Sequence, residues 1–600
     1  MPRHERDWNC RMIHRLLIDG RARFASPFAL GSGEASLASD RPLLVDDRGR
    51  PRVTATALAG SLRSLLERIA ASVTLDGVEG DDALMALFGS ALDDEATGDG
   101  PGGKALRSRP SRLRVGEPVA VGAGQVVLRD GVGIDRSSGG AKEDIKFDYE
   151  VAEGDAQFRV HLEFERGASG DQLAAAAEAL LVLGLREWQE GRLTLGGRAG
   201  SGLGVFVLDE VEVRLLDLSD RDTLRNWLRA RTSAAPAGRQ AGVVLPGGLN
   251  ALGAVDGPGV VATKAGPDGS SPGWLTAVVD LQADGPLLVA GASPVPQIVD
   301  HGPTHVADTS GSDAQALGRR GGGGDTSPIL PGSSLRGVLR SRAEQVVRFL
   351  GGPAAACDPF EDDARSPRLS CGRRALPGAA AGLAVENASP ARRRQLEGGR
   401  ALALRNGSCP VCRLFGTSQL GGRVTVAESL LEGGSVQLLD HVAIDRFTGG
   451  AVDARKFDAA PVVGARARLT IRVDRPTPSD AVLMLFVLRD LAEGWVPVGS
   501  RVTRGYGAVR GRLSEFEIAD VGAGPWAGVT AGADVEPGAI WRARRFTPPG
   551  TTFLGRDHAW DWLDDESELR RALVGGAKEL SAQSSAWQLG IENRSPSNDN

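Results

Sequence analysis

Hydrophobic residues along this chain follow two different spacings. Two segments keep the three-to-four-residue spacing of an amphipathic helix, with apolar residues at positions 58, 62, 65, 66 and 69 and at positions 335, 338, 339, 343, 346 and 347. Two other segments, 157–165 and 465–473, alternate apolar and polar residues, which predicts half-buried strands. The pattern therefore predicts matching sets of helices and strands in the two halves of the chain.

A strand and a glycine-rich turn precede each of the two amphipathic helices. The strands are expected within residues 21–33 and 275–291. Ser61 in the first half, and Ser333 and Ser334 in the second, are placed to cap the helices that follow. Each helix is thus expected to open directly from a glycine turn.

A second helix is expected in each half after the alternating strand. It should begin near Asp171 in the first half and near Ser479 in the second. The order strand, helix, strands, helix, strand is that of a ferredoxin-like domain. We therefore expect an α+β fold that is built twice.

Four landmarks occur twice in the same order. Residues 134–141 read IDRSSGGA and residues 444–451 read IDRFTGGA, 310 positions apart, and a Phe-Asp pair follows thirteen positions after each isoleucine. Besides the glycine turn, the other two landmarks are Leu-Phe-Gly at 87–89 and 414–416, and glycine loops at 196–204 and 499–507. The chain thus contains one structural unit used twice, which suits a partner that is itself periodic.

Six hundred residues are too many for one hydrophobic core, because domains usually hold about 100–200 residues. Two expanded domains are the simplest division. We expect a first unit at 12–233, a linker at 234–272, a second unit at 273–520 with an insertion at about 351–412, and a C-terminal extension at 521–600.

Composition narrows the function classes. No apolar run approaches the roughly 20 residues that span a bilayer, so a soluble, cytoplasmic protein without a membrane role is expected. The formal net charge is −6, whereas nucleic-acid-binding domains are usually basic overall or on one face. Any case for nucleic-acid binding must therefore come from local patches.

Four of the five cysteines lie in the expected insertion: Cys357, Cys371, Cys409 and Cys412. Four thiolates are the ligand set of a closed tetrahedral zinc site, and the two-residue spacing of the last pair lets both sulfurs reach one ion. The insertion lengthens the stretch between helix and Leu-Phe-Gly motif from 25 to 79 positions, and a metal would stabilise it. Buried free thiols are the alternative.

Basic residues and an aromatic residue gather around each Ile-Asp-Arg block. Such a hairpin suits RNA backbone contacts and base stacking, which contributes about 1–3 kcal/mol per base. The helix ends at the Gly-Ser elements would likewise favour phosphate. The alternatives are an ordinary capped helix, and a solvated hairpin in which the Asp and Arg pair with each other.

These motifs resemble those of the RAMP superfamily of CRISPR proteins, specifically the backbone subunits of type III effector complexes. They are Pro-Gly-Ser-Ser-Leu-Arg-Gly at 331–337, Cys-Pro-Val-Cys-Arg-Leu-Phe-Gly at 409–416, the two Ile-Asp-Arg blocks and the glycine loops, between about residues 20 and 510. The first copy departs from the pattern, since it has Ala-Gly-Ser-Leu at 59–62 and no cysteines.

The resemblance implies two tandem ferredoxin-like domains of the modified RNA-recognition-motif type, with long insertions and thumb hairpins. Each domain would bind the backbone of the guide RNA and insert its thumb hairpin between nucleotides. The implied partners are CRISPR guide RNA, target RNA and other type III effector subunits. The residues expected to bind RNA are Ser61, Arg63, Arg136, Lys146, Phe147, Ser333, Ser334, Arg336, Arg446, Arg455, Lys456, Phe457, Arg504 and Tyr506.

The resemblance also implies cleavage of target RNA at regular intervals by loop aspartates, with a divalent cation such as Mg or Mn. Asp40 falls where the family's Asp-x-Pro pattern places the catalytic carboxylate. In the second copy Asp300 is the first choice and Asp308 the second. Most loop aspartates are solvent-exposed turn formers, which is the alternative. A purely structural backbone subunit and a guide-processing ribonuclease are the competing functions.

Overall fold

The computed structural model describes most of the chain. The described residues are 14–33, 39–89, 110–122, 124–153, 156–167, 170–232, 242–246, 248–252, 260–262, 273–291, 302–303, 305–307, 326–374, 402–522, 524–533, 541–548 and 567–592.

The first unit is built on an antiparallel sheet with its first strand in the middle. Its four main strands are β1 (His14–Phe24), β4 (Leu113–Val115), β8 (Gln157–Arg166) and β10 (Val205–Asp217), in the spatial order β10, β1, β8, β4. The last strand thus lies beside the first, and the third separates the first from the second. This is the strand order of a ferredoxin-like sheet.

The second unit repeats this sheet. Its strands are β13 (Trp274–Ala283), β18 (Val424–Val426), β24 (Arg466–Asp474) and β25 (Val509–Asp520), in the order β25, β13, β24, β18. The central strand pairs on both sides over nearly its full length. The predicted α+β fold with two tandem ferredoxin-like domains is therefore confirmed.

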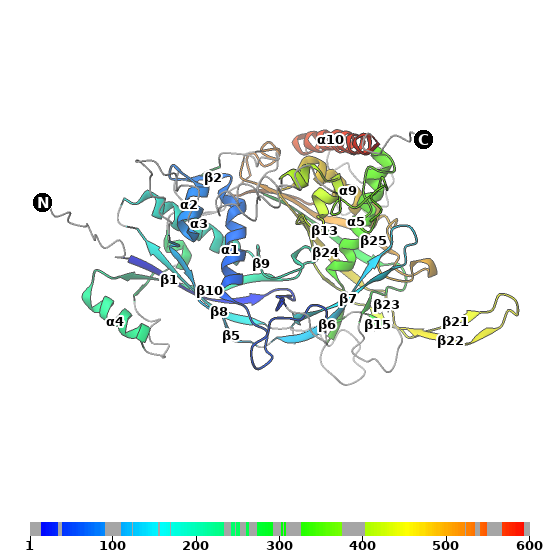
Figure 1. Cartoon of the computed structure of the whole chain (residues 1–600), viewed down its shortest axis with the longest axis horizontal. Coiled ribbons are helices and arrows are strands. Elements are labelled where there is room, and N and C mark those ends of the chain that lie inside the picture. The colour runs from blue at the N-terminus through cyan, green and yellow to red at the C-terminus, as the bar shows by residue number, and fades with distance from the viewer. Residues whose placement is uncertain are drawn as a thin grey trace.

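Helices pack on one face of each sheet (Figure 1). In the first unit they are α1 (Ala55–Ala70), α2 (Gly80–Phe88) and α3 (Gln172–Gln189); in the second they are α5 (Gly332–Gly351), α8 (Pro410–Phe415) and α9 (Pro478–Ala492). The predicted periodic positions face the core, because Leu62, Leu66, Leu335 and Leu339 are all fully buried.

The predicted caps of the first helices are wrong. The first helix begins earlier than expected, at Ala55, because the side chain of Thr54 accepts a hydrogen bond from the amide of Ala57 at 3.2 Å. Ser61 therefore lies in the second turn of α1. The N-cap of α5 is Pro331, which has no side-chain cap, so neither Ser333 nor Ser334 occupies that position.

A two-stranded hairpin extends from each unit. The first consists of β6 (Gln125–Ile134) and β7 (Ala141–Glu153), and the second of β21 (Leu439–Ile444) and β22 (Ala451–Ala459). The first lies along the second unit, whereas the second projects away from the molecule (Figure 1).

Shorter elements complete the two units. They are β2 (Val73–Leu75), β3 (Val78–Glu79), β5 (Val119–Ala120), β9 (Leu193–Thr194), η2 (Ala199–Ser201), α4 (Arg221–Thr232), β14 (Ala290–Gly291), β15 (Gly302–Pro303), β16 (His305–Ala307), β17 (Thr326–Leu330), β19 (Ser429–Leu430), β20 (Ser435–Val436), β23 (Val462–Val463) and η5 (Val502–Arg504).

The segment expected to be a linker, 234–272, contributes structure to the first unit. Its elements β11 (Val243–Val244) and β12 (Val260–Ala262) pair with β10 and β2, and η4 (Gly248–Leu252) places buried leucines against the same core. The free edges of β10 and β2 offer unpaired backbone groups that this segment satisfies. The described part of this segment therefore packs on the first unit.

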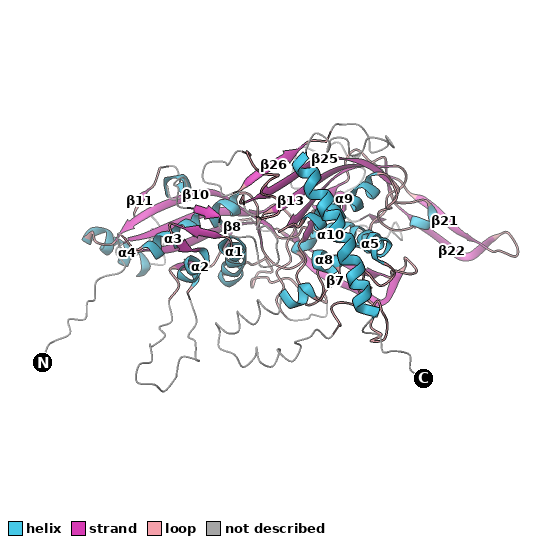
Figure 2. Ribbon diagram, turned by 90° about the horizontal axis from the view of Figure 1, so that it is seen from above, coloured by secondary structure: helices cyan, strands magenta, loops and turns pink. Residues whose placement is uncertain are grey.

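The C-terminal extension joins both units. Strand β26 (Arg542–Phe546) pairs with β25, and α10 (Ser567–Glu592) lies across α5 and α9 (Figures 1 and 2). Just before β26, Trp541 packs edge-on against Trp274 and donates a 2.7 Å hydrogen bond to Glu187 of the first unit. Within the part of the chain that the structure describes, no helix is long and apolar enough to cross a membrane.

Candidate RNA-binding surface and metal centre

The turn at the tip of each hairpin is organised by the aspartate of the Ile-Asp-Arg block. Asp135 accepts hydrogen bonds from the amides and hydroxyls of Ser137 and Ser138, and these bonds hold the pKa of its carboxyl well below the usual range. Asp445 accepts from the amides of Phe447 and Thr448, which likewise lowers its pKa. The aspartates therefore shape the turns, and they do not pair with the adjacent arginines.

Alternate residues along the first strand of the two hairpins are identical in sequence and exposed in both. The apolar residues of this common face are 40–57% exposed. They are Val126, Leu128, Val132 and Ile134 in β6, and Val436 in β20, Leu438 just before β21, and Val442 and Ile444 in β21. Asp130 and Asp440 occupy the remaining position of the same face. An apolar face kept unchanged in two places and left in solvent indicates a contact that both hairpins make.

An arginine lies over a phenylalanine at the base of each hairpin. The guanidinium of Arg198 is 4.8 Å from the ring centroid of Phe147, and that of Arg501 is 4.8 Å from that of Phe457. Both arginines come from the glycine loops and adopt left-handed backbone conformations, with φ of 60° and 58°. Both units thus place a loop arginine on a hairpin phenylalanine, and in the first unit Arg198 lies closer still to the ring of Tyr149, at 3.7 Å.

Further arginines join each pair. Arg41 lies 5.5 Å from the ring of Phe147, and Arg504 lies 5.4 Å from the ring of Phe457. Among the described residues, neither Arg41 nor Arg198 forms an ion pair with a carboxylate, and burial together with the charge of Arg41 lowers the pKa of Arg198. Guanidinium groups beside an aromatic ring suit a phosphate and a stacked base.

Arg198 and Arg501 are not among the residues that the sequence led us to expect at the RNA. The available signal was the alignment of the two glycine loops, which places an arginine third in each, at 196–204 and 499–507. Only the structure shows that these arginines lie on the phenylalanines of the hairpins.

Asp40 lies beside the base of the first hairpin. Its carboxylate accepts a hydrogen bond from the amide of Asp148 at 3.0 Å, and the carboxylate of Asp148 accepts one from the amide of Asp40 at 2.7 Å. Asp40 is exposed and directly precedes Arg41. The structure therefore brings the candidate carboxylate next to the arginine–phenylalanine pair of the first unit. Asp300 and Asp308 lie outside the described residues.

Several of the other expected RNA-binding residues are exposed on the hairpins. Lys146, Arg446 and Arg455 are exposed, and among the described residues none of them forms an ion pair. Lys456 is also exposed and pairs with Asp440 at 3.2 Å.

Tyr506 is 5% exposed, and its hydroxyl lies 2.9 Å from Nε2 of His441 in β21. The buried tyrosine therefore stabilises the second hairpin. The ring of His441 stacks on that of Phe457, with centroids 5.1 Å apart.

Ser61 lines a cavity on the face of α1. The cavity has a volume of about 360 Å³, and its lining includes Ser61, Ser64 and Arg68 together with the glycine-loop residue Gly196. Arg68 also pairs with Asp474 of the second unit at 3.3 Å. Arg63, by contrast, is held by Glu67 one turn later on α1, at 2.9 Å.

Two expected RNA-binding arginines are engaged inside the protein. Arg136 pairs with Glu344 of α5, which is 1% exposed, at 2.9 Å. Arg336 donates to the carbonyl oxygens of Phe415 and Val424, and its burial lowers its pKa to about 10. These contacts commit both side chains to the packing of the second unit.

The N-terminus of α5 is covered by the glycine loop of the first unit. A Cβ at Gly332 would lie 2.2 Å from the carbonyl oxygen of Ser201, so only glycine fits at this contact. Ser333 and Ser334 follow at the same helix end and are only partly exposed. This helix end, like Arg136 and Arg336, therefore takes part in the contact between the two units or in the packing of the second unit.

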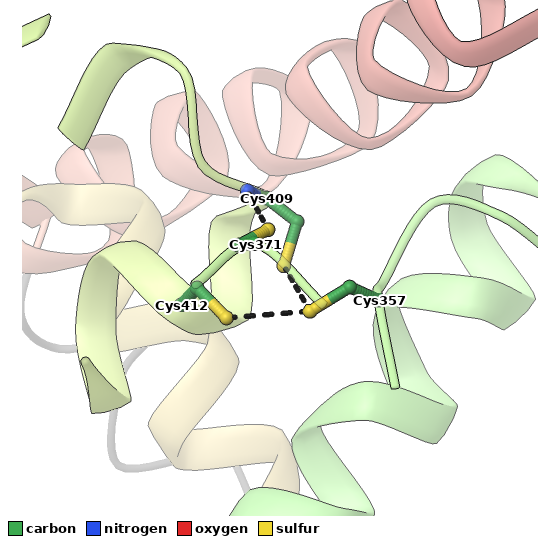
Figure 3. A group of neighbouring side chains, drawn as sticks. All are labelled: Cys357, Cys371, Cys409 and Cys412. Carbon is green, nitrogen blue, oxygen red and sulfur yellow. Dashed lines mark hydrogen bonds between the residues drawn. The ribbon is translucent and has the colours of Figure 1, made fainter. Parts of the chain in front are cut away.

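The four clustered cysteines converge in the second unit (Figure 3). All are at most 3% exposed, and their sulfur atoms lie within 4.8 Å of one another. The Sγ atoms of Cys357 and Cys412 are 3.4 Å apart, and those of Cys357 and Cys409 are 3.9 Å apart. Sulfur atoms at 2.3 Å from a tetrahedral zinc ion would be separated by about 3.8 Å. The cluster could therefore hold a metal ion such as zinc.

The surroundings of the cluster favour a cation inside it. Four thiolates that are buried this close together repel one another, so all four would be deprotonated only with a positive charge between them. Arg340 donates to Sγ of Cys412 at 3.3 Å and would offset part of the negative charge of a tetrathiolate site. Cys409 caps α8 and Cys412 lies in its first turn, so this short helix positions both.

A comparison with known protein families identifies both units. The family model described as RAMP superfamily matches residues 21–207 and 280–510, so that each region begins in a central strand and includes a hairpin and a glycine loop. No curated protein matches the chain. The chain therefore belongs to the RAMP superfamily, as a protein with two RAMP regions in tandem and a CRISPR-associated role in binding RNA.

Proposed function

We propose that the chain is a guide-RNA-binding backbone subunit of a type III CRISPR effector complex that cleaves complementary target RNA. The observation that carries this proposal is the repeated arginine–phenylalanine pair at the base of both hairpins. Two similar sites in one chain suit two successive segments of one RNA strand. Contacts to phosphates and to shape would make guide binding sensitive to salt and indifferent to spacer sequence.

The common face of each hairpin would act as the thumb. Its branched apolar side chains carry no hydrogen-bond donors that could read bases, but they can pack against a base that has been unstacked. The arginine–phenylalanine pair at the base of the hairpin would bind the adjacent phosphate and nucleotide base. Each unit would thereby displace the guide–target duplex once, at a fixed interval.

Cleavage is proposed at the displaced nucleotide in the first unit. The ribose 2′-oxygen would attack the adjacent phosphorus and lose its proton, while the 5′-oxygen of the next nucleotide leaves and gains one, giving a 2′,3′-cyclic phosphate. A bound divalent cation would stabilise the charge that develops on the phosphate oxygens. The carboxylate of Asp40 would orient the 2′-hydroxyl or hold water at the cation, with Arg41 and Arg198 close to the phosphate. Asp300 and Asp308 remain the proposed residues for the second unit.

A structural subunit that binds guide RNA without cutting is the second candidate. It is favoured by the reciprocal hydrogen bonds between Asp40 and Asp148, which give the Asp40 carboxylate a role in holding its loop. The two candidate functions predict different effects on target cleavage when the negative charge of Asp40 is removed.

Substitution of Asp40 separates these candidates. In the assembled complex, Asp40→Asn is expected to slow target cleavage at the first-unit site about 100-fold or more, because the amide keeps an acceptor for the Asp148 amide but loses the charge. Guide binding should stay within about twofold. The control is Asp47→Ala, in the same loop and also exposed. Unchanged cleavage at every site in a variant lacking Asp40, Asp300 and Asp308 would favour the structural subunit.

The arginine–phenylalanine pairs are tested by guide binding. Arg198→Ala combined with Arg501→Ala is expected to weaken guide-RNA affinity about tenfold or more, and to reduce the slope of log affinity against log salt by about 1 for each lost phosphate contact. Arg570→Ala, on the exposed side of α10, is the matched control. Filter binding at several salt concentrations measures both quantities, and an unchanged slope would contradict the assignment.

We also propose that the cysteine cluster binds one zinc ion with a structural role. Four thiolate ligands leave no open position for water or substrate. The ion would fix the segment between α5 and α8, on which α10 also packs.

A further inference from the structure

The first hairpin already forms an interface inside the chain. Arg129, which is 5% exposed, bonds to Glu153 of its own hairpin and to Glu428 of the second unit. Arg136 reaches the buried Glu344, and its guanidinium lies 5.9 Å from the ring of Phe360. These contacts show how the hairpin of one RAMP unit docks on the next unit.

The glycine loop of the first unit completes this interface. A Cβ at Gly202 would lie 2.6 Å from the carbonyl oxygen of Val426, and one at Gly200 would lie 3.1 Å from Arg336. The loop therefore fits closely between α5 and β18 of the second unit, and small residues are required there.

The same two elements of the second unit have no such neighbour in the described structure. We call hairpin β21–β22 together with the loop 499–507 the free docking end. The hairpin extends away from the body of the molecule (Figure 1), and Phe447 at its tip is fully exposed. Arg446, the counterpart of Arg136, is exposed, and Val502 in the loop is 40% exposed.

The hairpin faces that would meet a neighbour differ between the two units. Opposite the unchanged common face, every position on the first strand has changed. Val127, Arg129, Gly131 and Gly133 are replaced by Gln437, Leu439, His441 and Ala443.

Size and charge have both changed on that face. A Cβ at Gly133 would lie 2.9 Å from the ring of Phe360, so Ala443 could not dock in the same way. The loop is also bulkier, since Thr503 and Arg504 replace Gly200 and Ser201.

A second copy of this chain would offer the wrong surface to the free docking end. In the first unit, the position that corresponds to Glu344 is Ala71, the C-cap of α1, and the position that corresponds to Gly332 is Ala59. Glu117 corresponds to Glu428, but its carboxylate is already bound by Arg52 and by the amide of Ala55. Arg446 would thus face a methyl group, and Leu439 would face a carboxylate.

We propose that the free docking end binds a different protein subunit and excludes a second copy of this chain. The partner supplies a carboxylate to Arg446, an apolar surface to Leu439 and a recess for Val502 and Thr503. The common face is the surface that both hairpins share. The changed residues on the opposite face indicate that the second hairpin has a different protein neighbour. This inference rests on the proposed function only in taking the partner to be another subunit of the same complex.

Sedimentation and direct binding test the proposal. The purified full-length chain is expected to remain a monomer at concentrations of tens of micromolar. Each protein encoded beside it is then purified and titrated against it by biolayer interferometry, and one is expected to bind. Arg446→Glu should weaken that binding about tenfold or more. Arg570→Glu, on the exposed side of α10 and outside both hairpins, should leave it within about twofold.

Two results would overturn the proposal. One is concentration-dependent self-association that Arg446→Glu abolishes. The other is partner binding that Arg446→Glu leaves unchanged. Guide-RNA binding by the wild-type chain is measured in a parallel arm, so that a wild-type chain that binds its protein partner but no guide RNA would refute the proposed function alone. Restored affinity when Arg446→Glu meets a partner whose carboxylate is changed to arginine would confirm the contact.

Discussion

Replacing Cys409 and Cys412 together by serine is expected to release one zinc ion per chain and to destabilise the second unit by about 5 kcal/mol or more. Structural zinc contributes about 10–16 kcal/mol of apparent binding free energy in small domains, and loss of a metal site is among the largest effects of substitution. Here the sulfur atoms are buried in the core that α5, α8 and α10 share. Metal analysis by mass spectrometry and denaturant unfolding measure the two effects.

The matched control for this prediction is Cys10→Ser, which changes the remaining cysteine and should leave both metal content and stability unchanged. Wild-type protein that carries no stoichiometric metal after purification without chelators would contradict the zinc assignment. So would a double variant that unfolds at the same denaturant concentration as the wild type.

Substituting Arg129 by methionine is expected to lower the free energy of unfolding by about 3–5 kcal/mol. Removal of one partner from a buried ion pair leaves uncompensated charge, and here two carboxylates, Glu153 and Glu428, would remain. Burial already raises the pKa of Glu428, and the loss of Arg129 would raise it further. Chemical denaturation followed by tryptophan fluorescence measures the change.

The pH dependence of this variant gives a second check. A folded-state pKa above the unfolded value means that the native protein binds a proton more tightly, so the variant should regain stability as the pH falls through the raised pKa of Glu428. Adding Glu428→Gln to Arg129→Met should restore part of the loss. Arg23→Ala, whose pair with Asp209 is exposed, should cost about 1 kcal/mol or less. If Arg129→Met and Arg23→Ala lowered the free energy of unfolding equally, the first hairpin would not dock as described.

The repeated fold could be predicted because its signals are local. Leu62 and Leu66 in the first half, and Leu335 and Leu339 in the second, keep helical spacing, and the strands that follow alternate. The cysteine cluster was also predictable, since the two-residue spacing of Cys409 and Cys412 is itself a metal-ligand pattern. These features depend on residues close together in sequence or on one repeated order of elements.

What could not be predicted depends on distant contacts. Arg136 was expected to bind RNA, but its partner Glu344 lies 208 positions away in another unit. The helix end at Ser333 and Ser334 was expected to be open, and the glycine loop near Ser201 covers it. A basic residue or a helix end has the same local sequence whether it faces solvent or a neighbouring domain, so only the fold distinguishes the two cases.

The central claim is that both units lie along one RNA strand, and photo-crosslinking tests it most directly. A crosslinking amino acid is placed at Val132 and, in a separate protein, at Val442, the same position of the common face in the two hairpins. Each is irradiated in the complex with one guide RNA. The account predicts crosslinks at two sites on the same strand, separated by one constant interval for guides of different sequence. Crosslinks from both hairpins to the same nucleotides, or to none, would contradict it.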